Sequence, residues 1–438
     1  VSAQLAPLVS CERGNCLTKR CPYFYKCFLF KARRKLSESQ LIISNHAFFF
    51  SSLAMQDLDD TESASESLAL LPDFSAVIFD EGHTLEDVAA YHLGQRFETA
   101  GFKNLLNRIY IDDRRPKLLF DERSITARTR LNELRAYAEV FFNELANWVS
   151  LQINFGTTLR YNSPGVITNV LEEAIMALAG ELLILESRAA EDEAEWQQEI
   201  KSLREALVEE NEILSSFCAM RFENHAYWFE QYGTQKKELN LYLVPVEIGE
   251  LLRQKLFENP ADFSVIITSA TLTVAGDISF YLNRIGLQDT RTLILDSPFD
   301  FESQMTLYLG ESMPIPDSRE FYDEAEIHLK KFLMMTEGRA FVLFTSYSMM
   351  NKMADIMESF LKKENFQLYV QGGKHRPQKM LKLFREKERT VLFGTASFWT
   401  GVDISGEALS NVIICKLPFS VPDHPLTEAR TELIKARK

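Results

Sequence analysis

The sequence predicts an α/β protein built on two parallel-sheet domains, the first of which is interrupted by insertions. Three observations predict this fold. Apolar strands alternate with helical stretches on both sides of a long helical region at residues 95–225, and four cysteines gather in the first 27 residues. Continuous apolar strands that alternate with helices are typical of a parallel sheet covered on both faces.

The composition indicates a globular protein of several domains. A chain of 438 residues suggests about two to four domains. The hydrophobic content of 46% and the charged content of 25% are ordinary for globular proteins. No apolar run approaches the ~18 residues of a membrane-spanning helix, and no basic-then-apolar leader is visible.

The net charge of −14 argues at first against a nucleic-acid partner. The negative charge is concentrated, however, because residues 172–212 hold 13 acidic and 3 basic side chains. The remainder is nearly balanced and carries basic clusters at residues 31–35 and 114–117. The charge therefore leaves DNA or RNA open as a partner.

Cysteines at the start of the chain predict a metal centre rather than disulfides. Their spacings of five, five and six positions differ from the close pairs of structural zinc sites. Thiolates among aromatic residues suit an iron–sulfur cluster shielded from water. Zinc or unliganded thiols remain the alternatives, and Cys11 is the least certain ligand because the true fourth cysteine could lie upstream. The candidate ligands are Cys11, Cys16, Cys21 and Cys27.

The next segments lead towards the first sheet. A basic helix is expected from Phe28 to Ser37, then a strand over residues 40–44 that ends at Asn45 and His46. These two polar side chains are candidates for ligand contact, although a histidine satisfied at a strand end is the favoured interpretation of this segment alone. Residues 51–72 are acidic and rich in serine, which predicts a loop.

A buried strand over residues 76–79 ends on the adjacent carboxylates Asp80 and Glu81, followed by a glycine, His83 and an amphipathic helix start. Ligands of open α/β sheets bind at the carboxyl ends of strands. Two acids at this position are typical of nucleotide-hydrolysing domains, although an Asp-Glu pair alone more often marks an exposed turn.

Residues 95–225 show apolar side chains at helical spacing, which predicts a helical insertion whose stripes are core. The predicted stripes are Leu131, Leu134, Ala138, Phe141, Leu145 and Trp148, and further on Trp196, Ile200, Leu203 and Leu207. A β-hairpin at 226–245 and a helix at 248–257 follow. The apolar strand 264–268 then ends in Ser269-Ala-Thr-Leu272.

From residue 305 onward, strands and helices alternate and predict the second parallel-sheet domain. The loop 396–406 carries two glycines and an aspartate, which would let backbone and carboxylate approach a ligand. Strands are expected at 305–309, 340–346, 367–370, 390–393 and 411–415, and helices at 320–336, 348–363 and 376–386.

These motifs in this order resemble the iron–sulfur branch of superfamily-two DNA helicases, the XPD/DinG family, and most closely its bacterial DinG-like members. The Asp-Glu-Gly-His of residues 80–83, the Ser-Ala-Thr-Leu of 269–272 and the Ser-Phe-Trp-Thr-Gly-Val-Asp of 397–403 carry the resemblance. The Leu-Pro-Phe segment beginning at Leu417 strengthens it.

The resemblance implies two RecA-like (P-loop NTPase-type) motor domains, the first interrupted by a cysteine-rich cluster insertion and a helical arch. It implies an iron–sulfur segment at 1–35, the first motor at 36–95 and 226–300, the arch at 96–225 and the second motor at 301–438.

The family's roles carry over residue by residue. Asp80 resembles the carboxylate that holds Mg²⁺ through water, Glu81 the base that orients the attacking water, and His83 a coupling residue. Ser269 and Thr271 resemble the motif that couples hydrolysis to DNA movement.

In the second motor, Gly401 and Asp403 resemble contacts to ATP and the interdomain cleft. Phe398 and Trp399 would stack on bases or, equally, pack beneath their own loop. The candidate nucleic-acid-binding residues are thus Asn45, His46, Phe398 and Trp399.

The resemblance implies ATP, Mg²⁺ and a [4Fe–4S] cluster as cofactors, and 5′→3′ unwinding of DNA during repair or replication. The expected partners are single-stranded or junction DNA and other repair or replication proteins. We expect no membrane partner, a monomer and a cytoplasmic, nucleoid-associated location. A non-catalytic iron–sulfur DNA-binding module is the alternative, and the intact Asp80-Glu81 pair favours the motor.

The phosphate-binding Gly-x-x-x-x-Gly-Lys-Ser/Thr loop is missing from the sequence, as is the family's final arginine-containing motif. We therefore expect an internal fragment of a longer helicase.

Overall fold

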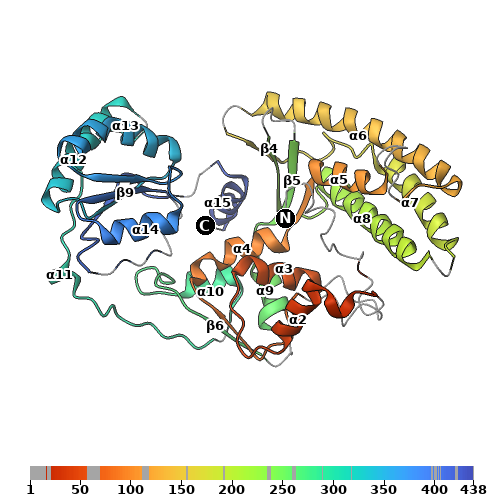
Figure 1. The fold of residues 1–438 in the computed structure, drawn as a ribbon, viewed down its shortest axis with the longest axis horizontal. Coiled ribbons are helices and arrows are strands. Elements are labelled where there is room, and N and C mark those ends of the chain that lie inside the picture. Colours follow the sequence, from red (N-terminus) through yellow and green to blue (C-terminus); the bar gives the residue numbers. More distant parts are fainter. Residues whose placement is uncertain are drawn as a thin grey trace. The chain divides into compact units, whose positions relative to one another are not determined.

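The computed structural model separates the chain into two compact units (Figure 1). The first comprises Val1–Ile294 with Val421–Lys438, and the second comprises Leu295–Ser420. The structure describes residue 16 and residues 21–437, except 57–69, 111–117, 154–155, 191–192, 234–237, 259–262, 289, 317, 396–397, 399–401, 403, 405 and 420–422.

The first unit combines helices with two separate sheets. Its helices are η2 (Phe24–Lys26), α2 (Phe28–Ser37), α3 (His46–Gln56), η3 (Gly82–Thr84), α4 (Leu85–Leu93), α5 (Thr99–Ile109), η4 (Glu122–Ser124), α6 (Ile125–Gln152), α7 (Glu172–Ser187), α8 (Ala194–Ala219), α9 (Gly249–Leu252), the π-helical η6 (Arg253–Phe257), α10 (Ser279–Ile285) and α15 (Pro425–Ala436). Its strands are β1 (Ala76–Phe79), β2 (Gln95–Glu98), β3 (Thr158–Tyr161), β4 (His225–Tyr232), β5 (Glu238–Pro245) and β6 (Ser264–Ile267).

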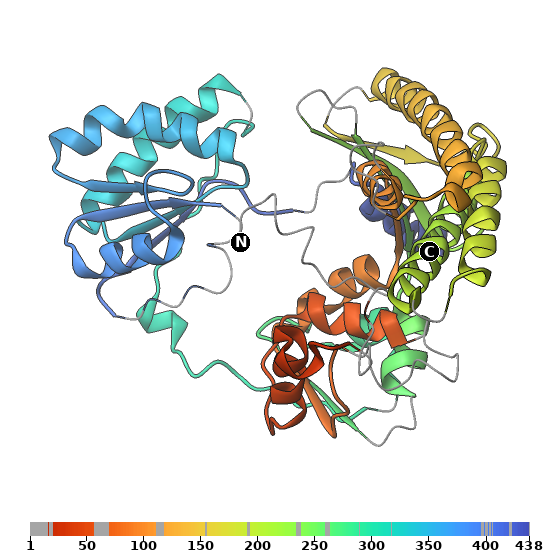
Figure 2. The ribbon, with the colours of Figure 1, turned by 45° about the vertical axis from the view of Figure 1, so that its right-hand side comes forward.

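An antiparallel sheet with strand order β2-β5-β4-β3 divides two hydrophobic cores. Successive side chains of a strand point to opposite faces. Tyr227 and Phe229 of β4 therefore enter the core formed with α5–α8, whereas Ala226 and Trp228 enter the core beneath α4. The helices of the first core run along one side of this sheet (Figure 2).

This sheet differs from the sequence prediction. β2 and β3 lie within the region expected to be helical, and each is only four residues long, which is too short for a clear alternation. The predicted hairpin is confirmed as β4 and β5, paired with Tyr227 opposite Leu243. One face of this hairpin packs on α5–α8. The expected end of the helical region at residue 225 therefore lies between these helices and the strands that cover them.

The long helix α6 buries a stripe that includes Leu131, Leu134 and Ala138, as predicted. Further along, Phe142 and Val149 are buried, whereas the predicted Phe141 and Trp148 lie at the edge of the core. The predicted stripe drifts because an α-helix turns once in 3.6 residues rather than in 3.5.

The second sheet of the first unit is a parallel pair, β1 with β6, in which Phe79 lies opposite Ile267. Helices α3 and α4 pack on it through Phe49, Phe50 and Leu85. The strand predicted at 40–44 is wrong, because residues 41–45 have no regular structure and α3 begins at His46. Residues 51–56, predicted as loop, continue this helix.

The second unit confirms the predicted parallel sheet, with strand order β10-β7-β9-β8. On β7, Ala340 and Val342 face the core made with α12 and α13, while Phe341 and Leu343 face α14. Residues 305–309, predicted as a strand, have no regular structure and are exposed. The elements are α11 (Phe301–Gln304), α12 (Arg319–Met335), β7 (Ala340–Leu343), α13 (Tyr347–Lys363), β8 (Gln367–Val370), α14 (Pro377–Glu386), β9 (Thr390–Gly394) and β10 (Asn411–Ile414).

Helix α15 departs from the predicted division of the chain. The prediction placed residues 301–438 in the second motor, yet α15 packs in the first unit, where Leu426 and Ala429 join the core that holds Trp228. In the parts of the chain that the structure describes, no helix is long and apolar enough to cross a bilayer.

Glu210 on α8 places a carboxyl group inside the helical core without a hydrogen-bond partner for Oε2. Burial, and after it the nearby Glu209 and Glu98, raises the pKa of Glu210 from 4.5 to about 7. The folded state therefore favours the protonated carboxyl, and stability falls as the pH rises from about 4.5 to 7.

We expect Glu210→Gln to raise the free energy of unfolding at pH 8 by up to about 3 kcal/mol, since ~1.4 kcal/mol accompanies each pKa unit. This increase in the free energy of unfolding becomes smaller towards pH 4.5, because Glu210 is then largely protonated in the wild type. Urea unfolding at pH 8 and pH 5 measures it, with Glu195→Gln as an exposed control on the same helix. An equal effect at both pH values would contradict the prediction.

Candidate functional site

Two predicted motifs meet at one edge of the parallel pair. β1 runs into Asp80 and Glu81, and β6 runs into Thr268 and Ser269. The ladder continues one step past the strands, because Thr268 N–H donates to the Phe79 carbonyl over 2.8 Å. Carboxyl ends of adjacent parallel strands share an edge, so motifs 186 positions apart in sequence come into contact there.

Asp80 is held by two donors at this edge. The Thr268 hydroxyl and the Glu81 backbone N–H each donate to Asp80 Oδ1 over 3.0 Å. Asp80 itself is exposed, so its other oxygen faces solvent. Mg²⁺ prefers oxygen ligands and usually binds one or two carboxylates while it keeps several of its waters. The exposed carboxylate of Asp80 therefore fits that ion.

The backbone turns sharply at Glu81, which adopts a left-handed conformation with φ 53° and ψ 44°. Non-glycine residues rarely adopt this region, and such strain concentrates at functional sites. Gly82 follows, and its N–H donates to the Thr268 carbonyl over 2.9 Å. A Cβ at position 82 would lie 2.3 Å from Ile267 Cγ2, so only glycine lets the two motifs approach this closely.

Tyr281 of α10 fixes the same turn, since its hydroxyl donates to the Gly82 carbonyl over 2.8 Å. Burial, followed by the charge of Glu86, raises the pKa of Tyr281 to about 12. The phenol therefore remains a donor at neutral pH.

His83 joins the two motifs directly. Its Nδ1 lies 3.0 Å from Ser269 Oγ and 3.3 Å from Glu81 Oε2. Ser269 Oγ also accepts from the Thr271 N–H over 3.3 Å. The predicted residues Glu81, His83, Ser269 and Thr271 thus form one connected set.

Asn45 and His46 lie at the start of α3 rather than at a strand end. Asn45 Oδ1 accepts from the Phe48 N–H over 2.7 Å, which makes Asn45 the N-cap of the helix. His46 Nδ1 lies 3.2 Å from Thr84 Oγ1, and its ring packs edge-on against Phe79. His46 thereby supports the turn after β1, and a nucleic-acid contact of either residue stays a prediction.

Sequence reasoning missed an ion-pair network directly behind the carboxylates. Glu86 and Asp87, in the first turn of α4, face two arginines from distant parts of the chain. Arg284 of α10 binds Glu86, and Arg430 of α15 binds Glu86 over 3.1 Å and Asp87 over 2.5 Å. Arg430 also donates from Nε to the Val246 carbonyl. Thr268, Tyr281, Arg284 and Arg430 carry no local sequence signal for these roles.

The other predicted site residues divide into two groups. Phe398 is buried against Phe341 and Gly394 in the second unit, which favours packing over base stacking. Trp399, Gly401 and Asp403 lie outside the described residues.

The predicted cluster ligands are described only in part. Cys11 lies outside the described residues, whereas Cys16, Cys21 and Cys27 are partly exposed. Among the residues that the structure describes, no group of three or more His, Cys, Asp or Glu side chains gathers to hold a metal ion. The described geometry therefore does not fit a preformed cluster site.

Comparison with known proteins supports the resemblance to DinG-like DNA helicases. Residues 329–438 match the family described as the helicase C-terminal domain. The chain is 30% identical over 431 residues to the ATP-dependent DNA helicase YoaA of Haemophilus influenzae, across 98% of this chain and 62% of that protein.

Two further relatives are similar over nearly all of this chain. The Escherichia coli YoaA helicase is 28% identical, across 99% of this chain and 64% of the relative. A Bacillus subtilis protein named 3′-5′ exonuclease DinG is 26% identical, across 94% of this chain and 47% of the relative. The chain thus spans less than two thirds of the length of these relatives.

The solved structure titled "Structure of S. tokodaii Xpd4" aligns at a TM-score of 0.46 and 14% identity, over 88% of this chain and 69% of that one.

We expect Arg430→Met to release α15, because breaking a buried ion pair costs about 3 kcal/mol or more. Arg430 and Glu86 are only 14% and 18% exposed. Hydrogen exchange of the amides in residues 425–436 measures the effect as faster exchange. The control is Arg437→Met, whose exposed pair with Glu247 is worth about 0–1 kcal/mol. Equal exchange in both variants would show that the network does not hold the helix.

Proposed function

We propose that this chain, which is similar over nearly its whole length to ATP-dependent DNA helicases, forms the greater part of the motor of an ATP-dependent DNA helicase. The contact between His83 and Ser269 supports the proposal most directly, because it joins the carboxylate motif to the Ser-Ala-Thr motif. A motor needs such a connection between hydrolysis and movement.

The carboxylate edge of β1 would serve ATP hydrolysis. Asp80, oriented by Thr268, would hold hydrated Mg²⁺, and Glu81, projected by its left-handed backbone, would orient the attacking water. The bound ion would neutralise charge on the phosphates. Phosphoryl transfer depends mainly on such positioning and charge neutralisation.

His83 would report the state of the nucleotide to the neighbouring strand. Its Nδ1 lies within hydrogen-bond reach of Glu81 and Ser269 at once, so a movement of Glu81 changes the contact with Ser269. Gly401 and Asp403 would supply the contacts of the second motor to ATP.

The proposed substrate is single-stranded DNA that is continuous with a duplex, unwound 5′→3′ in repair or replication. The proposed divisions are the cluster segment at 1–35, the first motor at 36–95 and 226–300, the arch at 96–225 and the second motor from 301. One face of β4 and β5 packs on the helices of the proposed arch, and the other face packs in the proposed first motor.

The β1–β6 pair is incomplete as an ATP site. Ile78 and Ile266 are exposed on one face, although parallel sheets are ordinarily covered on both faces. The phosphate-binding loop is also missing from the sequence. ATP hydrolysis is therefore proposed for a longer protein that contains this chain together with that loop.

We expect Glu81→Gln in such a longer protein to lower DNA-stimulated ATP hydrolysis by about 10²-fold or more, as loss of a general base does. ATP binding should persist, and Glu139→Gln, a remote exposed acid, should leave hydrolysis unchanged. Unwinding of duplexes with 5′ or 3′ tails reports the direction of movement.

The 438-residue chain alone should show no significant hydrolysis. DNA-stimulated turnover by the purified chain would contradict this expectation, and absence of unwinding by the longer wild-type protein would favour the non-catalytic module.

We also propose a [4Fe–4S] cluster on Cys16, Cys21, Cys27 and either Cys11 or an upstream cysteine. The cysteine spacing and the surrounding aromatic residues support it, while the described geometry does not. Anaerobically purified protein should be brown and contain ~4 iron atoms per chain. Cys27→Ser should remove both iron and colour, whereas Cys218→Ser should remove neither. One zinc per chain without colour would indicate a structural zinc site instead.

A further inference from the structure

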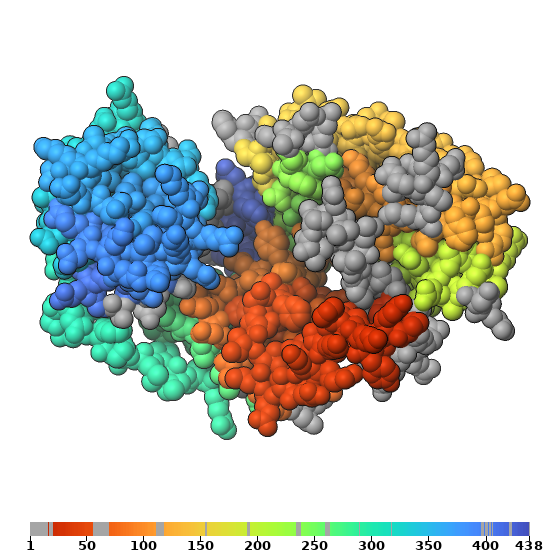
Figure 3. Space-filling view, in the orientation of Figure 1, coloured from red at the N-terminus to blue at the C-terminus, as the bar shows by residue number. Residues whose placement is uncertain are grey.

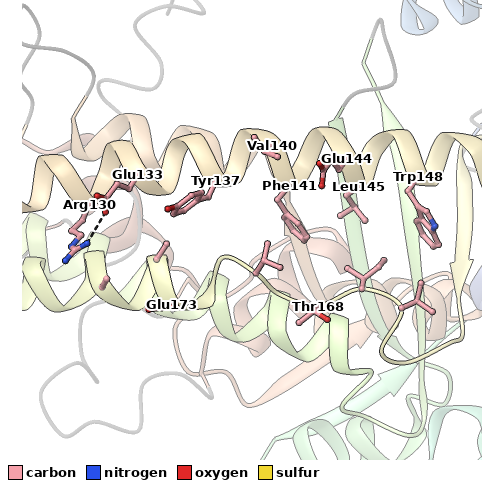
Figure 4. A pocket seen from close by; sticks show the side chains of 15 residues that line it. Arg130, Glu133, Tyr137, Val140, Phe141, Glu144, Leu145, Trp148, Thr168 and Glu173 are labelled. Atoms are coloured by element: carbon pink, nitrogen blue, oxygen red, sulfur yellow. Dashed lines mark hydrogen bonds and ion pairs between the residues drawn. The ribbon is translucent and has the colours of Figure 1, made fainter.

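A groove runs along the outer side of α6, between this helix and the segment that leads into α7 (Figure 4). Its volume is about 870 Å³. One wall is formed by α6 from Arg130 to Trp148, and the other by residues 166–170 and the first turns of α7. The helix lies at the surface of the first unit in the space-filling view (Figure 3).

The groove exists because α6 carries two neighbouring apolar stripes. The stripe that includes Leu131, Leu134 and Ala138 is buried in the core of the helical block. A second stripe lies about a quarter of a turn further around the helix axis, and it presents Tyr137, Val140 and Phe141 to the groove. The helix therefore offers apolar surface beside the stripe that its own core buries.

Several apolar side chains that line this groove are more than half exposed to solvent. Tyr137 and Val140 on one wall are each 58% exposed, and Val166 and Val170 on the other are 56% and 62% exposed. Single exposed apolar residues are normal, but a contiguous apolar patch with a polar rim marks an interaction site.

The rim of the groove is acidic. Arg130 pairs with Glu133 over 3.0 Å, which cancels both charges. Glu144 and Glu173 on opposite walls take part in no ion pair among the described residues. These two carboxylates repel phosphate and attract cationic side chains.

The shape of the groove fits a helix. From Arg130 to Trp148 the α6 wall extends about 27 Å, the length of an α-helix of about 18 residues. An amphipathic helix binds such a groove through anchors at i, i+3, i+4 and i+7. The apolar floor would receive these anchors, and Glu144 and Glu173 would pair with basic residues beside them.

We propose that this groove binds a basic amphipathic helix of a partner protein. The inference is independent of the proposed helicase activity, since the groove lies on α6 and α7 and uses no residue of the carboxylate site. It assigns the outer face of the arch to a protein and not to DNA.

The test uses a fluorescein-labelled peptide of about 18 residues, with leucine at the anchor spacing and lysine elsewhere, and a counterpart with glutamate in place of lysine. Anisotropy titrations of the 438-residue chain should show saturable binding of the lysine peptide and none of the glutamate peptide. Val140→Asp and the double variant Glu144→Lys, Glu173→Lys should each weaken binding by about tenfold or more.

Matched controls lie on the same helix. Glu139→Lys makes one such charge reversal on the opposite side of α6, and Ile125→Asp alters a side chain that is 55% exposed outside the groove. Both should bind the lysine peptide like the wild type. A benzophenone at the centre of the peptide should crosslink to residues 130–148 or 166–177.

Three outcomes overturn the proposal. The first is equal binding of the lysine peptide to all variants, or no binding at all. The second is self-association in sedimentation that Val140→Asp abolishes, which would assign the groove to a second copy. The third is binding of a single-stranded oligonucleotide that Val140→Asp abolishes, which would assign it to nucleic acid. Circular dichroism of each variant confirms that loss of binding is not loss of fold.

Discussion

The backbone ladder between Ala76–Phe79 and Ser264–Ile267 is the constraint on which the candidate site depends. Its register brings Asp80 beside Thr268, and the hydrogen bonds continue through Thr268 to Gly82. Every contact of the site, from Asp80 to Ser269, follows from that alignment. A slip of one residue would turn each side chain to the other face of the pair.

The antiparallel sheet joins the two hydrophobic cores of the first unit. Because Tyr227 and Phe229 face one core while Ala226 and Trp228 face the other, one hairpin binds the helical block to the part that carries the carboxylates. Gln231 of β4 also donates to the Ala146 carbonyl of α6, which attaches this helix to the sheet. The apolar stripe of α6 that remains exposed is then available for another protein.

The sequence predicted the elements whose signals are local. Continuous apolar runs identified β1, β6 and the strands of the second unit, and helical spacing identified α6 and α8. A strand was predicted at residues 40–44 and a loop from residue 51, but the Asn45 cap and the packing of Phe49 and Phe50 on Phe79 give a helix from His46 onward. Residues 305–309 are apolar but find no neighbouring strand.

The site was predictable only in its motifs. Asp80, Glu81 and His83 stand at a recognisable strand end, and Ser269 and Thr271 follow another. The residues that hold them could not be predicted, because each acts across a long separation. Arg430 reaches Asp87 over 343 positions, and Tyr281 reaches Gly82 over 199. Contacts over such separations leave no pattern of residue type or spacing that a single sequence would show.

The return of α15 to the first unit has a consequence for biosynthesis. Leu426 and Ala429 complete a core that begins with Phe49, and Arg430 supplies the last cation beside Glu86. Domains usually fold during translation from the N-terminal side. The core that holds Trp228 can therefore be completed only after residues 295–420 have been made.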